Sequence, residues 1–480
     1  MQTQPENFKR SAKQALHNST LKLAIRRTTD AAEAKRAAAV ESFPEFEKLR
    51  KQGEKIKDHV IQHMGHYLEQ FENNAIAQGA IVHWAQTAEQ ASAIVVDICQ
   101  QHQAKRITRS KSMLGEEIGL PDALEQAQLE RIETDLAEHI IQLAGDPPSH
   151  IVWPAMHRTR DEVVQLFRRH HHAPVESEAI EDLVQSARKQ LRQQFLNADI
   201  GISGANFLLA DSGSICTVTN EGNAELTTTP PPVHIVTAGI EKLVPSMAHA
   251  MPLLRLLVRS ATGSDITQYT TFHNGPKRQG DADGPKEYHI VLVDNGRTKM
   301  LAEGLSDMLR CIRCGACMNH CVVYKHIGGH AYGGVYPGPM GSVLTPTLDG
   351  LNRSKNLAHA CTLNGKCQEV CPVNIALPTL LRSWRASSWQ KGYEPITSRT
   401  GIGLFVQLAT RPALYRLFTA ISVIWMRLFV RKGWISWMPF ARSWTAERDL
   451  LAPGKATFMQ QYKQQQKQKK QHSKSGGKHV

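Results

Sequence analysis

The spacing of apolar positions gives the first part of the chain a helical character. Through residues 6–75, apolar residues recur every three or four positions, as at Ile56, Val60 and Met64, and this period predicts amphipathic helices. Pro44 interrupts the pattern, so we expect two or more helices rather than one. We therefore predict a helical lead-in over residues 1–75.

From residue 79 the pattern changes to short apolar runs separated by helix-like stretches. The predicted strands are 79–84, 106–108, 131–134, 150–153, 231–244 and 288–293, and the predicted helices are 87–103, 112–128 and 159–196. Strands that alternate with helices favour a parallel sheet, so residues 76–300 are predicted to form an α/β domain. Two alternating runs on either side of Asp211-Ser-Gly213 predict a β-hairpin.

Seven cysteines lie in two runs after this domain. The first run has the spacing C-x2-C-x2-C-x3-C, and the second ends in a Cys-Pro pair; the cysteines are Cys311, Cys314, Cys317, Cys321, Cys361, Cys367 and Cys371. This spacing is typical of two iron–sulfur clusters that exchange their fourth ligands. Structural zinc, the main alternative, usually takes four ligands. We predict two [4Fe-4S] clusters in a mostly helical ferredoxin-type domain over residues 301–395.

The two expected clusters differ in their number of cysteine ligands. Ligand exchange assigns four cysteines to the first cluster, Cys311, Cys314, Cys317 and Cys371, and three to the second, Cys321, Cys361 and Cys367. Asn364 stands where the repeat would place the eighth cysteine. Because an amide oxygen is a weaker iron ligand than a thiolate, the second cluster is expected to be a site-differentiated or [3Fe-4S] cluster.

Cysteine usage and the composition of the N-terminus indicate the cellular compartment. Only Cys99 and Cys216 lie outside the cysteine runs, so no disulfide framework exists and a reducing compartment is expected. The N-terminus carries no apolar signal-like run. We expect a cytoplasmic protein.

The net charge is +13, and residues 455–480 contribute seven lysines and no acid to it. This composition predicts a basic disordered tail. Because the excess is concentrated there, it argues against nucleic-acid binding by a basic, metal-stabilised folded domain. Weak association with an anionic membrane surface, at the inner face, stays open as an alternative.

Residues 396–454 are strongly apolar but are interrupted by Arg411, Pro412, Arg416 and Arg427. Charges this frequent do not suit a membrane span of ~20 residues. We expect an apolar helical region that packs on the protein or on a partner, and an interfacial membrane helix is the alternative.

Several segments of the α/β part resemble those of the lactate-utilization protein B family. They are Arg109-Ser-Lys-Ser-Met113, Asp146-Pro-Pro-Ser-His150, Gly201-Ile-Ser-Gly-Ala-Asn206 and Thr219-Asn-Glu-Gly-Asn-Ala224. The resemblance covers nearly the whole chain. It implies an α/β lactate-utilization domain similar in fold to the sugar-phosphate isomerase and CoA-transferase class, followed by a two-cluster ferredoxin-type domain and a helical C-terminal region.

For function, the resemblance implies an iron–sulfur electron-transfer subunit of a complex that oxidises L-lactate to pyruvate. Its partners would be the other subunits of that complex and a downstream redox acceptor. The chain has no Gly-x-Gly-x-x-Gly at the start of a helix after a strand, so no dinucleotide fingerprint indicates a hydride acceptor. We name no catalytic residue. An α/β-domain enzyme that carries a structural cluster remains the alternative.

Four polar residues of the α/β domain are candidates for binding a ligand or partner: Lys111, Ser112, Glu221 and Asn223. They lie in loops after predicted strands, where open α/β sheets usually bind ligands. The competing interpretation is structural. Asn220 and Asn223 would cap turns, and Lys111 would be a solvated surface cation.

Overall fold

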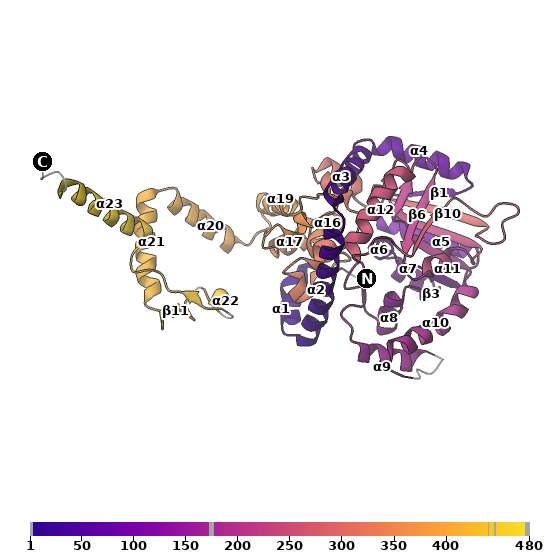
Figure 1. The fold of residues 1–480 in the computed structure, drawn as a ribbon, viewed down its shortest axis with the longest axis horizontal. Helices are drawn as coiled ribbons and strands as arrows, with labels where there is room; N and C mark the ends of the chain where they lie inside the picture. The colour runs from indigo at the N-terminus through magenta and orange to yellow at the C-terminus, as the bar shows by residue number, and fades with distance from the viewer. Residues whose placement is uncertain (1–2, 172–176, 440, 446–447, 476–480) are drawn as a thin grey trace. The chain divides into compact units, whose positions relative to one another are not determined.

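The computed structural model describes residues 3–171, 177–439, 441–445 and 448–475. The chain forms two compact units, residues 1–391 and 392–480. Figure 1 shows the large sheet within the first unit.

A six-stranded parallel sheet forms the centre of the α/β part. Its strands, in spatial order, are β1 (Ile81–Ala85), β10 (Glu287–Val293), β7 (Val233–Gly239), β4 (Ile200–Gly204), β2 (Arg106–Arg109) and β3 (Glu130–Glu133). Every neighbouring pair is parallel. The predicted α/β class is confirmed.

A smaller sheet packs beside the large one. It contains β8 (Leu243–Val244), β5 (Phe207–Leu209), β6 (Ser214–Thr219) and β9 (Tyr269–His273), in that order. Strands β5 and β6 are antiparallel around Asp211-Ser-Gly213, as the alternating runs predict. Gly213 has φ of +68°, and a Cβ there would lie 2.2 Å from the backbone nitrogen of Ala75. The turn therefore requires glycine.

Helices connect the strands and cover the large sheet. They are α5 (Ala88–Gln101), α6 (Met113–Glu117), α7 (Leu120–Gln126), α8 (Leu136–Ala144), α9 (Arg160–His170), α10 (Ile180–Leu196), α11 (Asn223–Thr228), α12 (Met247–Ala261) and α13 (Arg297–Ala302). The core on one face joins Ile107, Ile202 and Ile235 of the sheet to Val95 of α5 and Leu120 of α7. Central parallel strands are buried on both faces, which explains their continuous apolar runs.

Three details of the predicted α/β part differ from the structure. Residues 150–153 form no strand, because Nδ1 of His150 accepts the backbone N–H groups of Val152 and Trp153 and folds the segment on itself. The helix predicted over 112–128 is two helices, α6 and α7, which meet at Gly119 with φ of +68°. The helix predicted over 159–196 is also two, α9 and α10, and residues 172–176 lie outside the described part.

The lead-in helices pack on the cysteine region as well as on the α/β part. They are α1 (Phe8–Leu16), α2 (Ser19–Glu41), α3 (Phe46–Gln62) and α4 (Met64–Ala77). The cysteine region contributes α14 (Ala316–Asn319), α15 (Tyr324–Ile327), α16 (Gly338–Leu348), α17 (Leu351–His359), α18 (Lys366–Glu369) and α19 (Leu377–Gln390). Helix α2 contacts α14 and α15, and α3 contacts both α12 and the 3-10 helix Ser306–Arg310. Figure 1 shows α1 and α2 beside these helices.

The second unit is mainly helical, as expected for the C-terminal region. Its described elements are α20 (Ile396–Ala409), α21 (Pro412–Arg427), β11 (Trp434–Ile435), α22 (Arg442–Thr445), β12 (Leu450–Leu451) and α23 (Phe458–Ser475). Helix α23 occupies most of the tail that we expected to be disordered, because its Gln and Lys residues are good helix formers. Among the described helices, none has the length and apolar character that crossing a membrane requires.

Candidate functional site

Four cysteines from both runs converge on one small cavity. Cys311 and Cys314 reach it from the loop before α14, Cys317 reaches it from α14 itself, and Cys371 reaches it from the loop after α18. The remaining wall is apolar, with Ile312, Met340, Val373, Ile375 and Leu377 among its residues. Burial and the neighbouring thiol of Cys371 raise the pKa of Cys314 to about 12. Four thiolates held this closely require positive charge between them, so the donor set fits a four-iron cluster.

The other three cysteines form a second group. Burial and the neighbouring thiols of Cys361 and Cys321 raise the pKa of Cys367 to about 12. The backbone N–H of Leu363 donates a hydrogen bond of 3.3 Å to Sγ of Cys361. The hydroxyl group of Tyr332 also bonds to the thiol of Cys321. Three converging sulfurs with N–H and O–H donors fit an iron–sulfur cluster that lacks one protein thiolate.

The backbone repeats around the two cysteine runs. Arg313 and Leu363 have φ of +61° and +56°, and two residues later Gly315 and Gly365 have φ of +77° and +84°. A short helix follows each glycine. Between each pair stands one residue, Cys314 in the first loop and Asn364 in the second. The two loops are thus equivalent, and Asn364 occupies the position of Cys314.

Asn364 nevertheless lies in a different environment from Cys314. Cys314 is 8% exposed, whereas Asn364 is exposed to solvent. The side-chain oxygen of Asn364 accepts the backbone N–H of Lys366 at 3.2 Å, which forms a local turn. The fourth corner of the second group therefore faces water.

Arginines from distant elements bind the backbone of the second cysteine loop. Arg36 of α2 donates to the carbonyl of Val370 at 2.9 Å, and Arg50 of α3 donates to the carbonyl of Cys371 at 2.7 Å. Arg385 of α19 donates to the carbonyl of Cys361 at 2.6 Å. These cations fix the loop and place positive charge close to the thiols, and local charge of this kind raises the reduction potential of a cluster.

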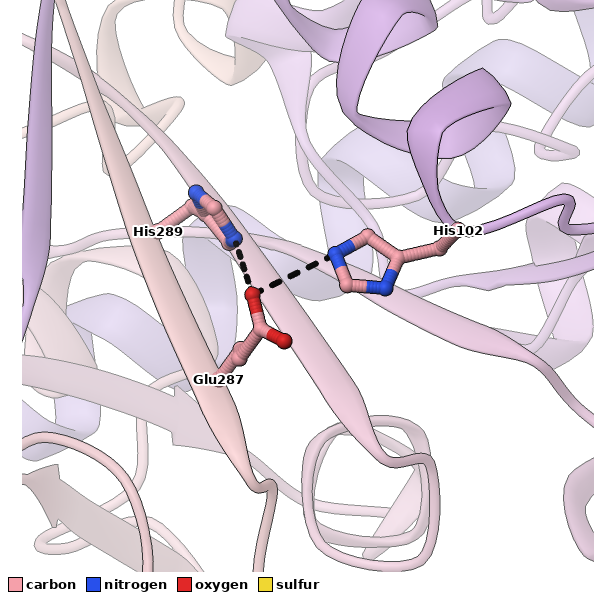
Figure 2. A group of neighbouring side chains, drawn as sticks. All are labelled: His102, Glu287 and His289. Atoms are coloured by element: carbon pink, nitrogen blue, oxygen red, sulfur yellow. Dashed lines mark ion pairs between the residues drawn. The ribbon is translucent and has the colours of Figure 1, made fainter.

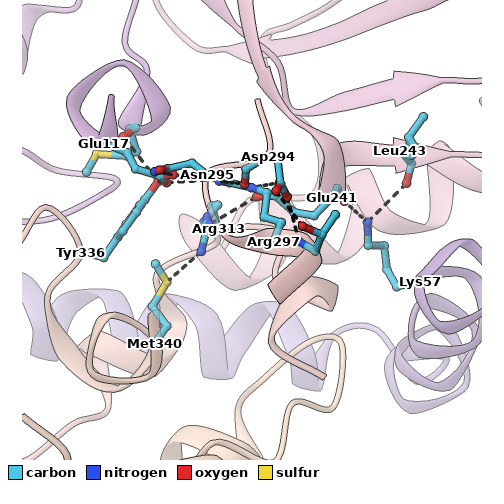
Figure 3. Close-up of polar contacts among 12 residues, drawn as sticks. Lys57, Glu117, Glu241, Leu243, Asp294, Asn295, Arg297, Arg313, Tyr336 and Met340 are labelled. Atoms are coloured by element: carbon cyan, nitrogen blue, oxygen red, sulfur yellow. Dashed lines mark hydrogen bonds and ion pairs between the residues drawn. The ribbon is translucent and has the colours of Figure 1, made fainter. Parts of the chain in front are cut away.

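A buried ionic network joins the first cysteine loop to the large sheet, as Figure 3 shows. Glu241, which follows β7 and is 3% exposed, pairs with Arg297 of α13 and with Arg313 of the cysteine loop. Arg297 also pairs with Glu117 at 2.8 Å, and Glu117 accepts the hydroxyl of Tyr336 at 2.7 Å. The guanidinium groups of Arg297 and Arg313 lower the pKa of Glu241 to about 2 against the opposing effect of burial.

Two lysines lie beside this network. Nζ of the buried Lys57 donates to the carbonyls of Glu241 and Leu243. Lys242 lines the neighbouring cavity, and its Nζ makes no hydrogen bond or ion pair in the described part of the chain. Burial lowers the pKa of Lys242 to about 8, the Glu241 carboxylate opposes this shift, and Arg313 adds to it.

The cavity has a volume of about 360 Å³ and lies at the carboxyl ends of β2, β4 and β7. All four polar residues singled out from the sequence line it: Lys111, Ser112, Glu221 and Asn223. Arg313 and Tyr336 of the cysteine region complete its wall. The cavity thus lies between the sheet and the first cysteine loop, and its size is within the range of small-ligand sites.

The contacts of these four residues show which of them have structural roles. The Ser112 hydroxyl caps α6, and the Asn223 side chain accepts the Thr219 hydroxyl at 2.8 Å, so both have structural roles. Lys111 is half-buried and donates to the carbonyl of Val152. It is therefore not a solvated surface cation. Burial and the neighbouring Asp135 raise the pKa of Glu221.

Sequence patterns missed several functional neighbours of the cysteines. Arg36 and Arg50 lie in the lead-in, and no local pattern links them to Cys371. Glu241 and Lys242 could have been found, since they lie in the short 3-10 helix Ile240–Lys242 that follows β7 at the sheet edge where ligands bind. Arg313 lies between two predicted ligands, and its charge alone marks it as a candidate.

Comparisons with known families agree with this division of the chain. The LUD domain model matches residues 68–293, and the 4Fe-4S dicluster domain model matches residues 307–375. The second match supports iron–sulfur clusters as the cofactors, and the two matches together correspond to the α/β part and the cysteine region.

Curated relatives match over nearly the full length. Lactate utilization protein B of Bacillus velezensis is 40% identical over 96% of this chain and 98% of its own length. The same protein of Bacillus subtilis is 40% identical over 94% of this chain and 95% of its own length. The "Uncharacterized electron transport protein YkgF" of Escherichia coli is 37% identical over 98% and 99%. With this similarity and both domains present, the chain belongs to the lactate utilization protein B family and is an iron–sulfur protein of lactate utilization.

Proposed function

We propose that this chain is the electron-transfer subunit of a complex that oxidises L-lactate to pyruvate. Cys311, Cys314, Cys317 and Cys371 would hold one cluster, and Cys321, Cys361 and Cys367 the other. The observation that supports this assignment is the convergence of cysteines from both runs on one cavity. Iron–sulfur clusters supply one-electron transfer. The chain contributes the ligands, the N–H donors and the arginines that hold the cysteine loops in place.

The single chain should not oxidise lactate without partner subunits. No nucleophile–base pair or dinucleotide fingerprint was found in its sequence. We expect the pure, cluster-replete chain to show no L-lactate-dependent dye reduction, and the reaction should appear when the other subunits of the complex are added. Rapid lactate oxidation by the single chain would contradict the proposal and would favour an enzyme activity of the α/β domain.

The second cluster should lose iron more readily than the first. Its fourth corner faces water at Asn364, and an amide oxygen binds iron weakly. Mild oxidation should therefore produce the near-isotropic EPR signal of a three-iron cluster from about one cluster per chain. Asn364→Cys should suppress this signal, and Asn364→Ser, which restores no thiolate, is the matched control.

Two outcomes would contradict this assignment. Wild-type protein with two equally oxidation-resistant four-iron clusters, unchanged by Asn364→Cys, would mean that another residue supplies the eighth ligand. Equal suppression of the signal by both variants would mean that the thiolate is not the cause.

We also propose that the cavity beside the first cysteine loop binds a small carboxylate. Lys242 has an unpaired Nζ in its wall, Lys111 lies on the same lining, and both lie within a volume suited to a small molecule. An anion bound there would lie next to Arg313 and would lower the reduction potential of the adjacent cluster by adding negative charge.

Calorimetry with L-lactate and pyruvate, together with redox titration, tests this site. Binding of either acid should be weakened at least about tenfold by Lys242→Met, since one lost charge-assisted hydrogen bond costs ~1.5–3 kcal/mol. Lys105→Met is the matched control, because Lys105 is exposed and precedes β2 at the opposite edge of the sheet. Binding that is absent, or equally strong in Lys242→Met, would reject the site.

Finally, we propose that the C-terminal unit associates with an anionic membrane surface. Residues 396–480 contain 15 Lys and Arg residues against two acidic residues, so they carry the whole net charge of +13. Helices α20 and α21 have no buried residue, and their exposed apolar side chains include Phe405, Leu417, Phe418, Ile421 and Ile424. Exposed apolar helices with flanking cations are typical of interfacial segments, and each cation near the surface adds ~1 kcal/mol.

Vesicle flotation tests the membrane proposal. The full chain should float with vesicles that contain phosphatidylglycerol, and not with pure phosphatidylcholine vesicles, and salt should weaken the binding. The double change Phe418→Glu with Ile421→Glu should abolish flotation. Ile266→Glu is the matched control, since Ile266 is 76% exposed in the first unit. A full chain that stays unbound to anionic vesicles at low salt would overturn the proposal and would favour a protein partner.

A further inference from the structure

Two histidines and a glutamate meet at the edge of the large sheet that lies opposite the cavity. Glu287 and His289 are the first and third residues of β10, and His102 is the residue that ends α5. Figure 2 shows the three side chains pointing toward one another. The three ligand atoms lie within 4.8 Å of one another. None of these residues belongs to the cysteine groups or to the cavity.

The distances among these atoms match those around a tetrahedral metal ion. Oε2 of Glu287 lies 3.3 Å from Nε2 of His102 and 3.6 Å from Nε2 of His289. Ligands bound to zinc at ~2.0–2.1 Å in tetrahedral geometry stand about 3.3–3.4 Å apart. The third pair, the ligand nitrogens of His102 and His289, lies within 4.8 Å and has to approach further to reach this separation.

His289 has an unsatisfied nitrogen that faces the group. The residue is 5% exposed, and its Nε2 has no hydrogen-bond partner among the described residues, since Oε2 of Glu287 at 3.6 Å lies beyond hydrogen-bond distance. Its Nδ1 lies 3.0 Å from Nε2 of His83 on the neighbouring strand β1. When Nδ1 carries the proton and donates to His83, Nε2 presents its lone pair to the centre of the group. Such a partner on the second ring nitrogen is characteristic of metal-binding histidines.

We propose that His102, Glu287 and His289 bind a divalent zinc-like metal ion, with His83 as the positioning residue for His289. Two imidazoles and one carboxylate form a donor set that zinc uses in three-ligand sites with an open fourth position. Because the side chain of Glu287 is 48% exposed and that of His102 is 27% exposed, water has access to that position and the ion can exchange. The bound ion ties the end of α5 to the start of β10.

Zinc binding to the full-length, cluster-replete chain tests the proposal. The protein is kept anaerobic so that the cysteines remain occupied by iron. It is incubated with zinc, desalted and measured by mass spectrometry for zinc and iron. We expect one zinc per chain with unchanged iron, and zinc X-ray absorption should show only nitrogen and oxygen neighbours.

Variants locate the ion. Glu287→Gln keeps the size of an exposed side chain, so it should fold normally and lose the zinc. His289→Ala should also lose it. His83→Phe should weaken zinc affinity about 10- to 100-fold, as expected when a metal ligand loses its hydrogen-bond partner. The matched control is His63→Ala, which removes an exposed histidine whose ring lies tilted against that of His59 in α3, and it should bind zinc like the wild type.

Three results would overturn the site. They are the absence of zinc in the wild type, full zinc retention in Glu287→Gln, and sulfur neighbours in the absorption spectrum. Loss of zinc in His63→Ala instead would assign the ion to the α3 histidine pair.

Discussion

Glu241 is a buried carboxylate whose charge is tolerated only because two guanidinium groups lie against it. Removing one partner of such a buried group typically costs ~3–5 kcal/mol, since the remaining charge is left without compensation. Its partners come from separate parts of the chain: Arg297 begins α13, and Arg313 lies between two cysteines. The same contacts therefore fix the position of the first cysteine loop against the sheet and shape one wall of the cavity. Together with the hydrogen bond from Tyr336 to Glu117, these ion pairs hold the first cysteine loop beside the cavity.

The two cysteine groups have the same backbone and different surroundings. The loops share their positive φ angles and the short helix that follows. The first group is enclosed by apolar residues such as Met340 and Ile375, whereas the second opens to water at Asn364. Solvent exposure and the number of thiolates both tune cluster potential. The two cysteine groups thus share one repeated backbone motif but would give their clusters different reduction potentials.

The features that could be predicted from the sequence are those that depend on residues close together in the chain. Cysteine spacing indicates which thiols can share a cluster, and alternation of strand and helix indicates a parallel sheet. The predicted strand at residues 150–153 is wrong. The apolar pattern there suits a strand, but the His150 side chain accepts hydrogen bonds from the backbone N–H groups of Val152 and Trp153. The sequence could not identify the contacts of Arg50 with Cys371, because 321 residues separate the two and only the packed fold brings them together.

The arginines of α2 and α3 have a consequence for the order of assembly. The carbonyls that Arg36 and Arg50 bind belong to residues that are synthesised more than 300 positions after these helices. Contacts this distant in sequence form late in folding, because a long loop has to close before they are made. The contacts by which these two arginines dock α2 and α3 on the second cysteine loop are therefore complete only after that loop has been synthesised.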